Sequence, residues 1–183
     1  AGPEVAVAST KAFSTQLVSL YWFASKMAYE KKLISKKEFE LKEDDIFVVA
    51  EMLENSLEKA KHTIIDTIAP LYAQYDTAIF LGRHISFPFA EEAALKLKEI
   101  AYVFAQAHPA GELKHGPLAL IDKQTPVYLF SHPDNAIYQK LLVSAQEIKA
   151  RNGVIISFLF EGQDELAALS DHSIMFPIIS GNL

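Results

Sequence analysis

The sequence predicts an α/β protein in which a helical segment precedes a parallel sheet flanked by helices. From about residue 77 onward, short apolar runs alternate with helix-length segments, which is typical of buried parallel strands joined by helices. The first 75 residues instead show the three- and four-residue spacing of amphipathic helices. Half of the 183 residues are hydrophobic and 22% are charged, which supplies enough apolar material for a folded core.

The helical part is expected to contain amphipathic helices joined by a turn. Apolar residues lie on one helical face over residues 13–28, and a second stripe runs from 46 to 68. The charged stretch 31–45 separates the two stripes and is predicted to be the turn. Because an interior proline removes a helical hydrogen bond, Pro70 predicts two helices with a break near Lys61 instead of one unbroken helix.

The sheet part, residues 76–183, alternates apolar runs with helices. Parallel strands that are buried on both faces have continuous apolar sequences, and helices cross over between them. Ligands of such sheets bind at the carboxyl ends of the strands. The expected strands are 78–81, 127–130, 154–160 and 173–176, and the expected helices are 86–104 and 134–152.

Composition excludes several classes of function. The net charge of −6 and the lack of a strongly basic stretch argue against a nucleic-acid partner. The absence of cysteine excludes disulfides, thiolate metal sites and a cysteine nucleophile, and it suits a reducing compartment. No apolar run reaches the roughly 18 residues of a membrane span, so no membrane association is expected. The histidines other than His115 lack the spacing of metal ligands, so no metal site is expected either.

The helix 86–104 combines a largely apolar surface with three charges. Glu92, Lys96 and Glu99 are spaced four and three residues apart and so share one face. Charges on a largely buried helix need partners or a function. Two interpretations remain open: a ladder of ion pairs along an exposed edge, or a carboxylate base at Glu99 held by Lys96.

A second candidate site is the segment 111–117, with the sequence GELKHGP. Two glycines and a proline bracket the ionisable groups, as in a loop that presents a side chain to a ligand. His115 can take up or release a proton near neutral pH. A solvated turn with an incidental histidine is the alternative interpretation. Arg83, directly after the first strand, can contact an anion, although a single Gly-Arg pair is weak evidence.

Four motifs make the sequence recognisable. In chain order they are VASTKAF (7–13), LGR (81–83), ALKLKEI (94–100) and AGELKHGPLAL (110–120). Together they resemble the isomerase region of the glutamine–fructose-6-phosphate aminotransferases (isomerizing), the glucosamine-6-phosphate synthase family. That region contains two sugar isomerase (SIS) domains, each a flavodoxin-like parallel sheet flanked by helices. The resemblance implies that residues 1–75 are the helical end of the first SIS domain with its connecting helices. Residues 76–183 are then the second SIS domain, truncated at the C-terminus.

The resemblance also implies roles for five residues. Glu99 matches the base that moves a proton between C1 and C2 of the open-chain sugar. Lys96 matches a lysine near the sugar, and Val7 and Ser9 match the loop that touches it. His115 matches the histidine that assists ring opening and serves the active site of the neighbouring subunit. The chemistry is consistent, because a proton transfer between adjacent carbons needs one base that can both take and return the proton.

The reaction implied by the family is the formation of glucosamine 6-phosphate from fructose 6-phosphate and glutamine, a cytoplasmic step of aminosugar biosynthesis without metal or organic cofactor. The expected partners are the sugar phosphate, a second copy of the chain in a homodimer, and a glutaminase domain of the same full-length chain. The family's sugar-phosphate loops and its imine-forming lysine fall outside residues 1–183, so this chain alone should be inactive. Gln106 and Ala93 depart from the family, which usually carries Glu and Gly there.

Two other functions remain as alternatives. One is a sugar-phosphate isomerase or deaminase of the SIS fold without a glutaminase domain. The other is a non-catalytic SIS module that binds a sugar phosphate. A glutaminase domain with a leading cysteine upstream would exclude the first, and proton exchange at C1 or C2 would exclude the second.

Overall fold

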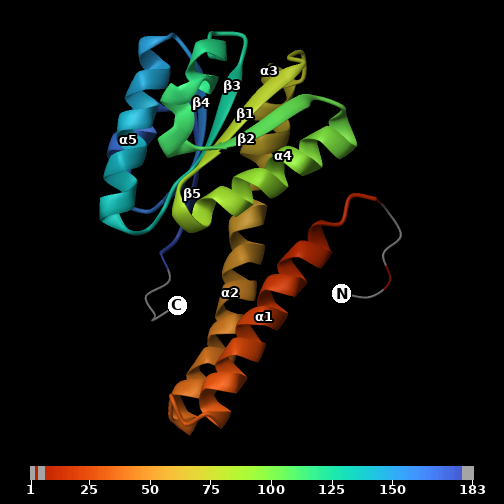
Figure 1. Ribbon diagram of the computed structural model, residues 1–183. Helices are drawn as coiled ribbons and strands as arrows, with labels where there is room; N and C mark the ends of the chain where they lie inside the picture. The colour runs from red at the N-terminus through yellow and green to blue at the C-terminus, as the bar shows by residue number, and fades with distance from the viewer. Residues whose placement is uncertain (1–2, 4–6, 179–183) are drawn as a thin grey trace. The chain divides into compact units, whose positions relative to one another are not determined.

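The computed structural model describes residue 3 and residues 7–178 (Figure 1). The predicted truncation of both chain ends lies outside these described residues. Contacts divide the chain into two compact units, one extending to Leu57 and the other spanning Glu58–Ile178. Each unit has its own internal contacts.

The first unit is a pair of helices, α1 (Thr10–Glu30) and the larger part of α2 (Lys36–His62). Trp22 Nε1 donates a hydrogen bond to Glu43 Oε1 at 2.9 Å, which joins the two helices. Nearer the turn, the rings of Tyr29 and Phe39 stack with 5.3 Å between their centroids. The first predicted apolar stripe therefore lies on α1, and the second lies on α2 as far as that helix extends.

The prediction that residues 31–45 form the turn was wrong for most of that stretch. The non-helical segment ends at Ser35, and α2 begins at Lys36. Ser35 Oγ accepts a hydrogen bond from the Glu38 backbone N–H at 3.2 Å, while Glu38 Oε2 accepts one from the Ser35 N–H at 2.7 Å. This reciprocal capping box starts the helix, so the charges that follow lie on a solvated helical face. The hydrogen bond to the Ser35 backbone also lowers the pKa of Glu38.

The backbone stays helical where a break near Lys61 was predicted. After His62 it passes into a π-helical segment, Thr63–Ile68, and then into the short helix α3 (Ala69–Tyr72). Pro70 lies in the first turn of α3, where a missing N–H costs little. The proline therefore coincides with a change of helix type and not with a break in the helical path.

The second unit contains a five-stranded parallel sheet with the order β2-β1-β3-β4-β5. This is the flavodoxin-like order, in which the direction of winding reverses between β1 and β3. The predicted α/β class is confirmed, as are four predicted strands; β2 was missed. The strands are β1 (Thr77–Gly82), β2 (Phe104–Pro109), β3 (Pro126–Phe130), β4 (Val154–Phe160) and β5 (His172–Phe176).

Helices cover both faces of the sheet, with α4 and α5 on opposite sides (Figure 1). On one side α4 (Phe87–Ala101) packs Ala90 and Ala94 against Phe80 of β1. On the other side α5 (Asn135–Ala150) buries Leu141, Ala145 and Ile148 against β1, β3 and β4. Asp134 caps α5 by accepting a hydrogen bond from the Ile137 N–H at 3.1 Å, as the predicted start of this helix requires. A further short helix, α6 (Asp164–Leu169), was not predicted.

The predicted helix 86–104 ends earlier than its apolar sequence indicated. Helix α4 stops at Ala101, and Tyr102 adopts a left-handed conformation with φ of 56°. The chain then turns into β2, whose first residue is Phe104. The apolar residues that were assigned to the end of the helix therefore belong to an edge strand.

The start of α4 approaches β1 so closely that residue 82 must be glycine. A methyl group on Gly82 would lie 2.4 Å from the backbone oxygen of Ser86 and 2.7 Å from Phe87 Cα. Both atoms belong to backbone, so neither can move aside cheaply. We expect Gly82→Ala to lower the free energy of unfolding by about 2–4 kcal/mol, as measured by urea unfolding followed by circular dichroism.

Gly111→Ala is the matched control for that substitution. The three atoms nearest to a methyl group there belong to the guanidinium of Arg83, the closest at 3.3 Å, and a side-chain terminus can shift. We expect a change within about 1 kcal/mol for this variant. Equal unfolding midpoints for the two variants would contradict the role given to Gly82.

Candidate functional site

The three charged residues of α4 form one connected group. Lys96 Nζ lies 2.7 Å from Glu99 Oε2 and 3.5 Å from Glu92 Oε1. The three side chains are only 16%, 26% and 23% exposed in the same order, so the charges are largely withdrawn from water. The ion pairs of the first interpretation are therefore present, although not on an exposed edge, and the role of Glu99 as a base stays a prediction.

The lysine of this group is held in its charged form. Its hydrogen bond to Glu99 is the largest cause that raises the pKa of Lys96, and Glu92 adds to it, while partial burial acts in the opposite direction. The ammonium group therefore stays protonated at neutral pH and donates to the Glu99 carboxylate. The hydrogen bond from Lys96 at 2.7 Å thus positions the Glu99 carboxylate next to a positive charge.

The segment that carries His115 is built on a 3₁₀ helix, η3 (Ala110–His115), that follows β2. Two contacts attach it to α5. Ser144 Oγ donates to the Ala110 carbonyl at 3.2 Å, and Lys114 Nζ pairs with Glu147 Oε1 at 2.6 Å. These contacts fix the backbone of η3 against the core of the second unit.

His115 stands at the exposed end of this anchored segment. Gly116 follows it with φ of 142°, a conformation that side chains rarely adopt, and turns the chain into a second 3₁₀ helix, η4 (Pro117–Leu120). Within residues 7–178 no hydrogen bond or ion pair holds the His115 ring. The segment is therefore a 3₁₀ helix anchored to α5 with an exposed imidazole at its end, and the role of His115 stays a prediction.

Within a single chain, His115 and Glu99 lie far apart. Helix α4 runs antiparallel to β2, so Glu99, two residues before its end, lies near the amino end of β2. His115 follows the carboxyl end of the same strand. Six residues of strand correspond to about 20 Å, whereas groups that exchange a proton through one substrate atom must lie within hydrogen-bond reach of it.

The two predicted sugar-contacting residues, Val7 and Ser9, belong to the first unit. Val7 is 87% exposed, and Ser9 occupies the N-cap position of α1 without a side-chain capping bond. The structure therefore leaves these positions accessible, and their assignment as sugar contacts stays a prediction.

The sequence analysis missed a buried polar network at the carboxyl ends of the strands. Ser86 Oγ donates to the Ser131 carbonyl at 2.7 Å, which ties the start of α4 to the end of β3. Ser131 Oγ donates to Gln163 Oε1 at 2.6 Å, and Gln163 Nε2 donates to the His132 carbonyl at 2.8 Å. Polar residues directly after two expected strands were the available signal, because such positions meet at one edge of a parallel sheet.

His132 belongs to the same edge and is 7% exposed. Its Nδ1 accepts a hydrogen bond from the Asp134 N–H at 2.9 Å, while its Nε2 is buried without a partner. The ring of His84 lies edge-on to it, with 5.6 Å between the centroids. Burial, followed by the neighbouring His84, lowers the pKa of His132, so this ring is neutral at pH 7.

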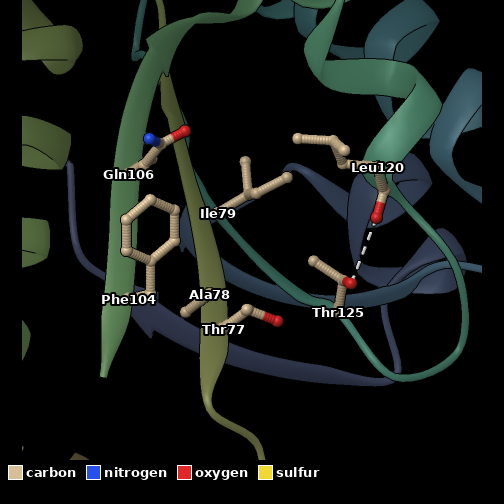
Figure 2. A pocket seen from close by; sticks show the side chains of 7 residues that line it. All are labelled: Thr77, Ala78, Ile79, Phe104, Gln106, Leu120 and Thr125. Atoms are coloured by element: carbon tan, nitrogen blue, oxygen red, sulfur yellow. Dashed lines mark hydrogen bonds between the residues drawn. The ribbon is translucent and has the colours of Figure 1, made fainter. Parts of the chain in front are cut away.

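A hollow of about 250 Å³ lies at the opposite edge, near the amino ends of β1 and β2 (Figure 2). The Gln106 side chain projects into it beside the Phe104 ring, and the Thr125 hydroxyl closes it by donating to the Leu120 carbonyl at 3.1 Å. None of the predicted site residues lines this hollow. The lining residues are Thr77, Ala78, Ile79, Phe104, Gln106, Leu120 and Thr125.

Two negative findings concern the described residues alone. Among them, no group of three or more His, Cys, Asp or Glu side chains is arranged to hold a metal ion. No helix in the same part of the chain is long and apolar enough to cross a membrane.

The five-stranded parallel sheet with helices on both faces places the chain in the α/β class, and the sequence identifies a family within that class. The SIS domain family matches residues 71–179, and the chain belongs to this family. The chain is 42% identical over 180 residues to glutamine–fructose-6-phosphate aminotransferase (isomerizing) of Pseudomonas aeruginosa. That match covers 98% of this chain but only 29% of the relative. The chain therefore spans less than a third of the relative's length and corresponds to its isomerase part.

Solved structures of related proteins have the same fold as this chain. The C-terminal domain of glucosamine-fructose-6-phosphate aminotransferase from Francisella tularensis superposes with a TM-score of 0.85 and 39% identity, over 99% of this chain and 50% of that one. Glucosamine-6-phosphate deaminase from Thermotoga maritima superposes with a TM-score of 0.62 and 27% identity, over 85% of this chain and 44% of that one. The resemblance inferred from the four motifs is thereby confirmed, as is the SIS fold.

The charged group on α4 makes a direct test possible. Because the hydrogen bond to Glu99 is the main cause of the raised Lys96 pKa, Glu99→Gln should lower that pKa, so that Lys96 loses its proton at a lower pH. Glu92→Gln, the matched control, removes the longer contact and should lower it less. An NMR titration of the lysine side chain measures both, and an unchanged Lys96 pKa in Glu99→Gln would contradict the pairing.

Proposed function

We propose that this chain supplies the isomerase site of a glutamine–fructose-6-phosphate aminotransferase, a transferase of aminosugar biosynthesis that yields glucosamine 6-phosphate. The observation that carries the proposal is the Lys96–Glu99 pair at 2.7 Å, on a helix that lies within a region 42% identical to such an enzyme. No other carboxylate of α4 has so short a contact with a cation among the described residues.

Glu99 acts in this proposal as the base that takes a proton from C1 of the aminated open-chain sugar and returns it to C2. Between the two transfers the sugar is an enolamine-like intermediate, in which negative charge develops on the nitrogen attached to C2, the former carbonyl carbon. Lys96 donates a hydrogen bond to Glu99 and places an ammonium group where it can stabilise that charge. No metal or organic cofactor takes part in this scheme.

His115 assists ring opening in the active site of a neighbouring subunit, so the proposed working form is a homodimer. The separation of His115 from Glu99 along β2 supports this arrangement, because one sugar phosphate cannot reach both within one chain. Val7 and Ser9 contact the sugar, and ammonia comes from a glutaminase domain of the same full-length chain. The 183-residue chain alone is inactive in this proposal, and the full-length enzyme is cytoplasmic.

The alternative is a SIS-fold isomerase or deaminase that works without glutamine. The superposition on the Thermotoga maritima deaminase, at 27% identity, is the observation that favours it. Glutamine-dependent product formation by the complete protein would exclude it. A non-catalytic sugar-phosphate-binding module would be excluded by incorporation of solvent deuterium at C1 or C2.

The base assignment predicts a selective loss of activity. In the complete protein, Glu99→Gln should reduce sugar isomerisation on the order of 10³-fold, because a carboxamide cannot accept the proton. Glutamine hydrolysis should remain largely intact, since it uses another domain. Glu92→Gln, which keeps the Lys96–Glu99 contact, should retain most isomerisation; near-normal isomerisation in Glu99→Gln would refute the assignment.

The shared site predicts complementation between two inactive variants. An equal mixture of Glu99→Gln and His115→Ala subunits should recover about a quarter of the wild-type rate, because half of the dimers are mixed and each mixed dimer has one intact site. Each variant alone should stay inactive. A mixture as inactive as its components, with subunit exchange verified by mass spectrometry, would show that His115 serves its own chain.

A further inference from the structure

Helix α5 holds the η3 segment through two side chains that lie one helical turn apart. Ser144 is 4% exposed, and its Oγ donates to the carbonyl of Ala110, the first residue of η3. Glu147 Oε1 accepts the ammonium group of Lys114, the residue before His115, at 2.6 Å. Because residues three apart share a helical face, the same face of α5 holds both ends of η3.

The Lys114–Glu147 pair is poorly suited to stabilise the fold. The Glu147 side chain is 22% exposed, and its Oε2 is buried without a hydrogen-bond partner among the described residues. Withdrawing a carboxylate from water and leaving one of its oxygens unpaired is unfavourable. The Lys114 side chain is 59% exposed, so the pair restricts a lysine that water would solvate well. Stability therefore does not explain why a carboxylate is buried at this position.

Packing alone does not fix the direction of His115. Leu113 is 0% exposed and determines how deep η3 lies in the core, but one buried side leaves a short helix free to rotate about its axis. Gly116, on the other side of His115, has no side chain to pack, and a Cβ there would have no atom within 4 Å. Within residues 7–178, the contact between Lys114 and Glu147 is the ion pair next to the imidazole, and it limits that rotation.

We propose that Glu147 is a positioning residue for His115: by holding Lys114 against α5, it sets the direction in which the imidazole points. Glu147 neither touches the sugar nor moves a proton. The inference rests on the proposed function, in which His115 assists ring opening in the active site of a neighbouring subunit. The sugar lies in that other subunit, so contacts within its own chain have to orient the imidazole, and a small misplacement of a reacting group lowers the rate strongly.

The test measures sugar isomerisation by the complete protein with Glu147→Gln. The carboxamide has the same shape but no charge, so its bond to Lys114 is weaker. We expect a rate on the order of tenfold lower, with an unchanged midpoint of urea unfolding. The double variant Lys114→Glu/Glu147→Lys, which forms the ion pair in the opposite direction, should recover most of the rate. A merely structural role of Glu147 would lower the midpoint together with the rate.

Two further variants of α5 are matched controls. Ser144→Ala leaves the buried Ala110 carbonyl unpaired, so it should lower the unfolding midpoint while the rate stays within about twofold. Lys149→Gln removes an ion pair with Asp171, in which Nζ and Oδ2 lie 3.0 Å apart and no residue of η3 takes part. It should leave the rate unchanged.

Mixed dimers show which partner of the shared site the substitution affects. If Glu147 acts through His115, Glu147→Gln should recover about a quarter of the wild-type rate when mixed equally with Glu99→Gln, because each mixed dimer then has one intact site. A mixture with His115→Ala should show no recovery, because no dimer then contains a correctly oriented imidazole. A variant that merely unfolds would not distinguish the two partners.

Three results would overturn the proposal while the proposed function stands: a full rate in Glu147→Gln when His115→Ala is inactive, recovery in the mixture of these two variants, or no rescue by the exchanged pair. Full isomerisation by His115→Ala would instead refute the role of His115, and that of Glu147 with it. Full activity of Glu99→Gln would refute the base and leave the rate and rescue measurements valid. Lys114→Gln, at an exposed position, carries the same test if Glu147→Gln does not fold.

Discussion

The contact between β1 and the start of α4 is the constraint on which the site geometry depends. At Gly82 the Ser86 backbone oxygen lies where a side chain would begin, 2.4 Å from the position of a Cβ. Further along α4, Ala90 and Ala94 are 0% and 1% exposed and continue the same close packing against the sheet. Three positions with little or no side chain leave the helix no freedom to slide or tilt. The charged face of α4 is therefore held in one orientation before any ligand arrives.

The same turn also organises the carboxyl edge of the sheet. Ser86 points back to the end of β3, and Ser131 and Gln163 extend the connection to the segment that follows β4. These bonds are buried, so loss of any one would leave an unpaired polar group in the core. The loops at this edge are therefore held in one arrangement by bonds within the chain.

Local pattern predicted most of this fold because buried parallel strands and amphipathic helices have strong sequence signals. One of its failures, at the end of α4, arose because a residue acted against its own propensity. Tyr102 ends α4 in a left-handed conformation that glycine usually adopts. Because no glycine marks this end, the apolar residues up to Phe104 were assigned to the helix, and the edge strand β2 was not predicted. The spacing of Lys96 and Glu99 predicted their contact, since helix geometry alone brings them together. The network that links Ser86 through Ser131 to Gln163 joins residues 77 positions apart, so the pattern within any one helix or strand does not encode its contacts.

The placement of Glu99 follows from chain topology and has a chemical consequence. In a right-handed β-α-β unit the helix returns the chain to the amino edge of the sheet, so a residue near its end lies far from the carboxyl edge where loops usually carry ligand sites. Glu99 and Lys96 occupy that unusual place on the side of α4, and neither lines the described hollow near the amino ends of β1 and β2. A helix side forms a cleft only when another body packs beside it. In the proposed function, a base on α4 therefore needs a second surface that excludes water and holds the sugar. We propose that His115 of another chain, anchored at the other edge of its own sheet, forms part of that surface.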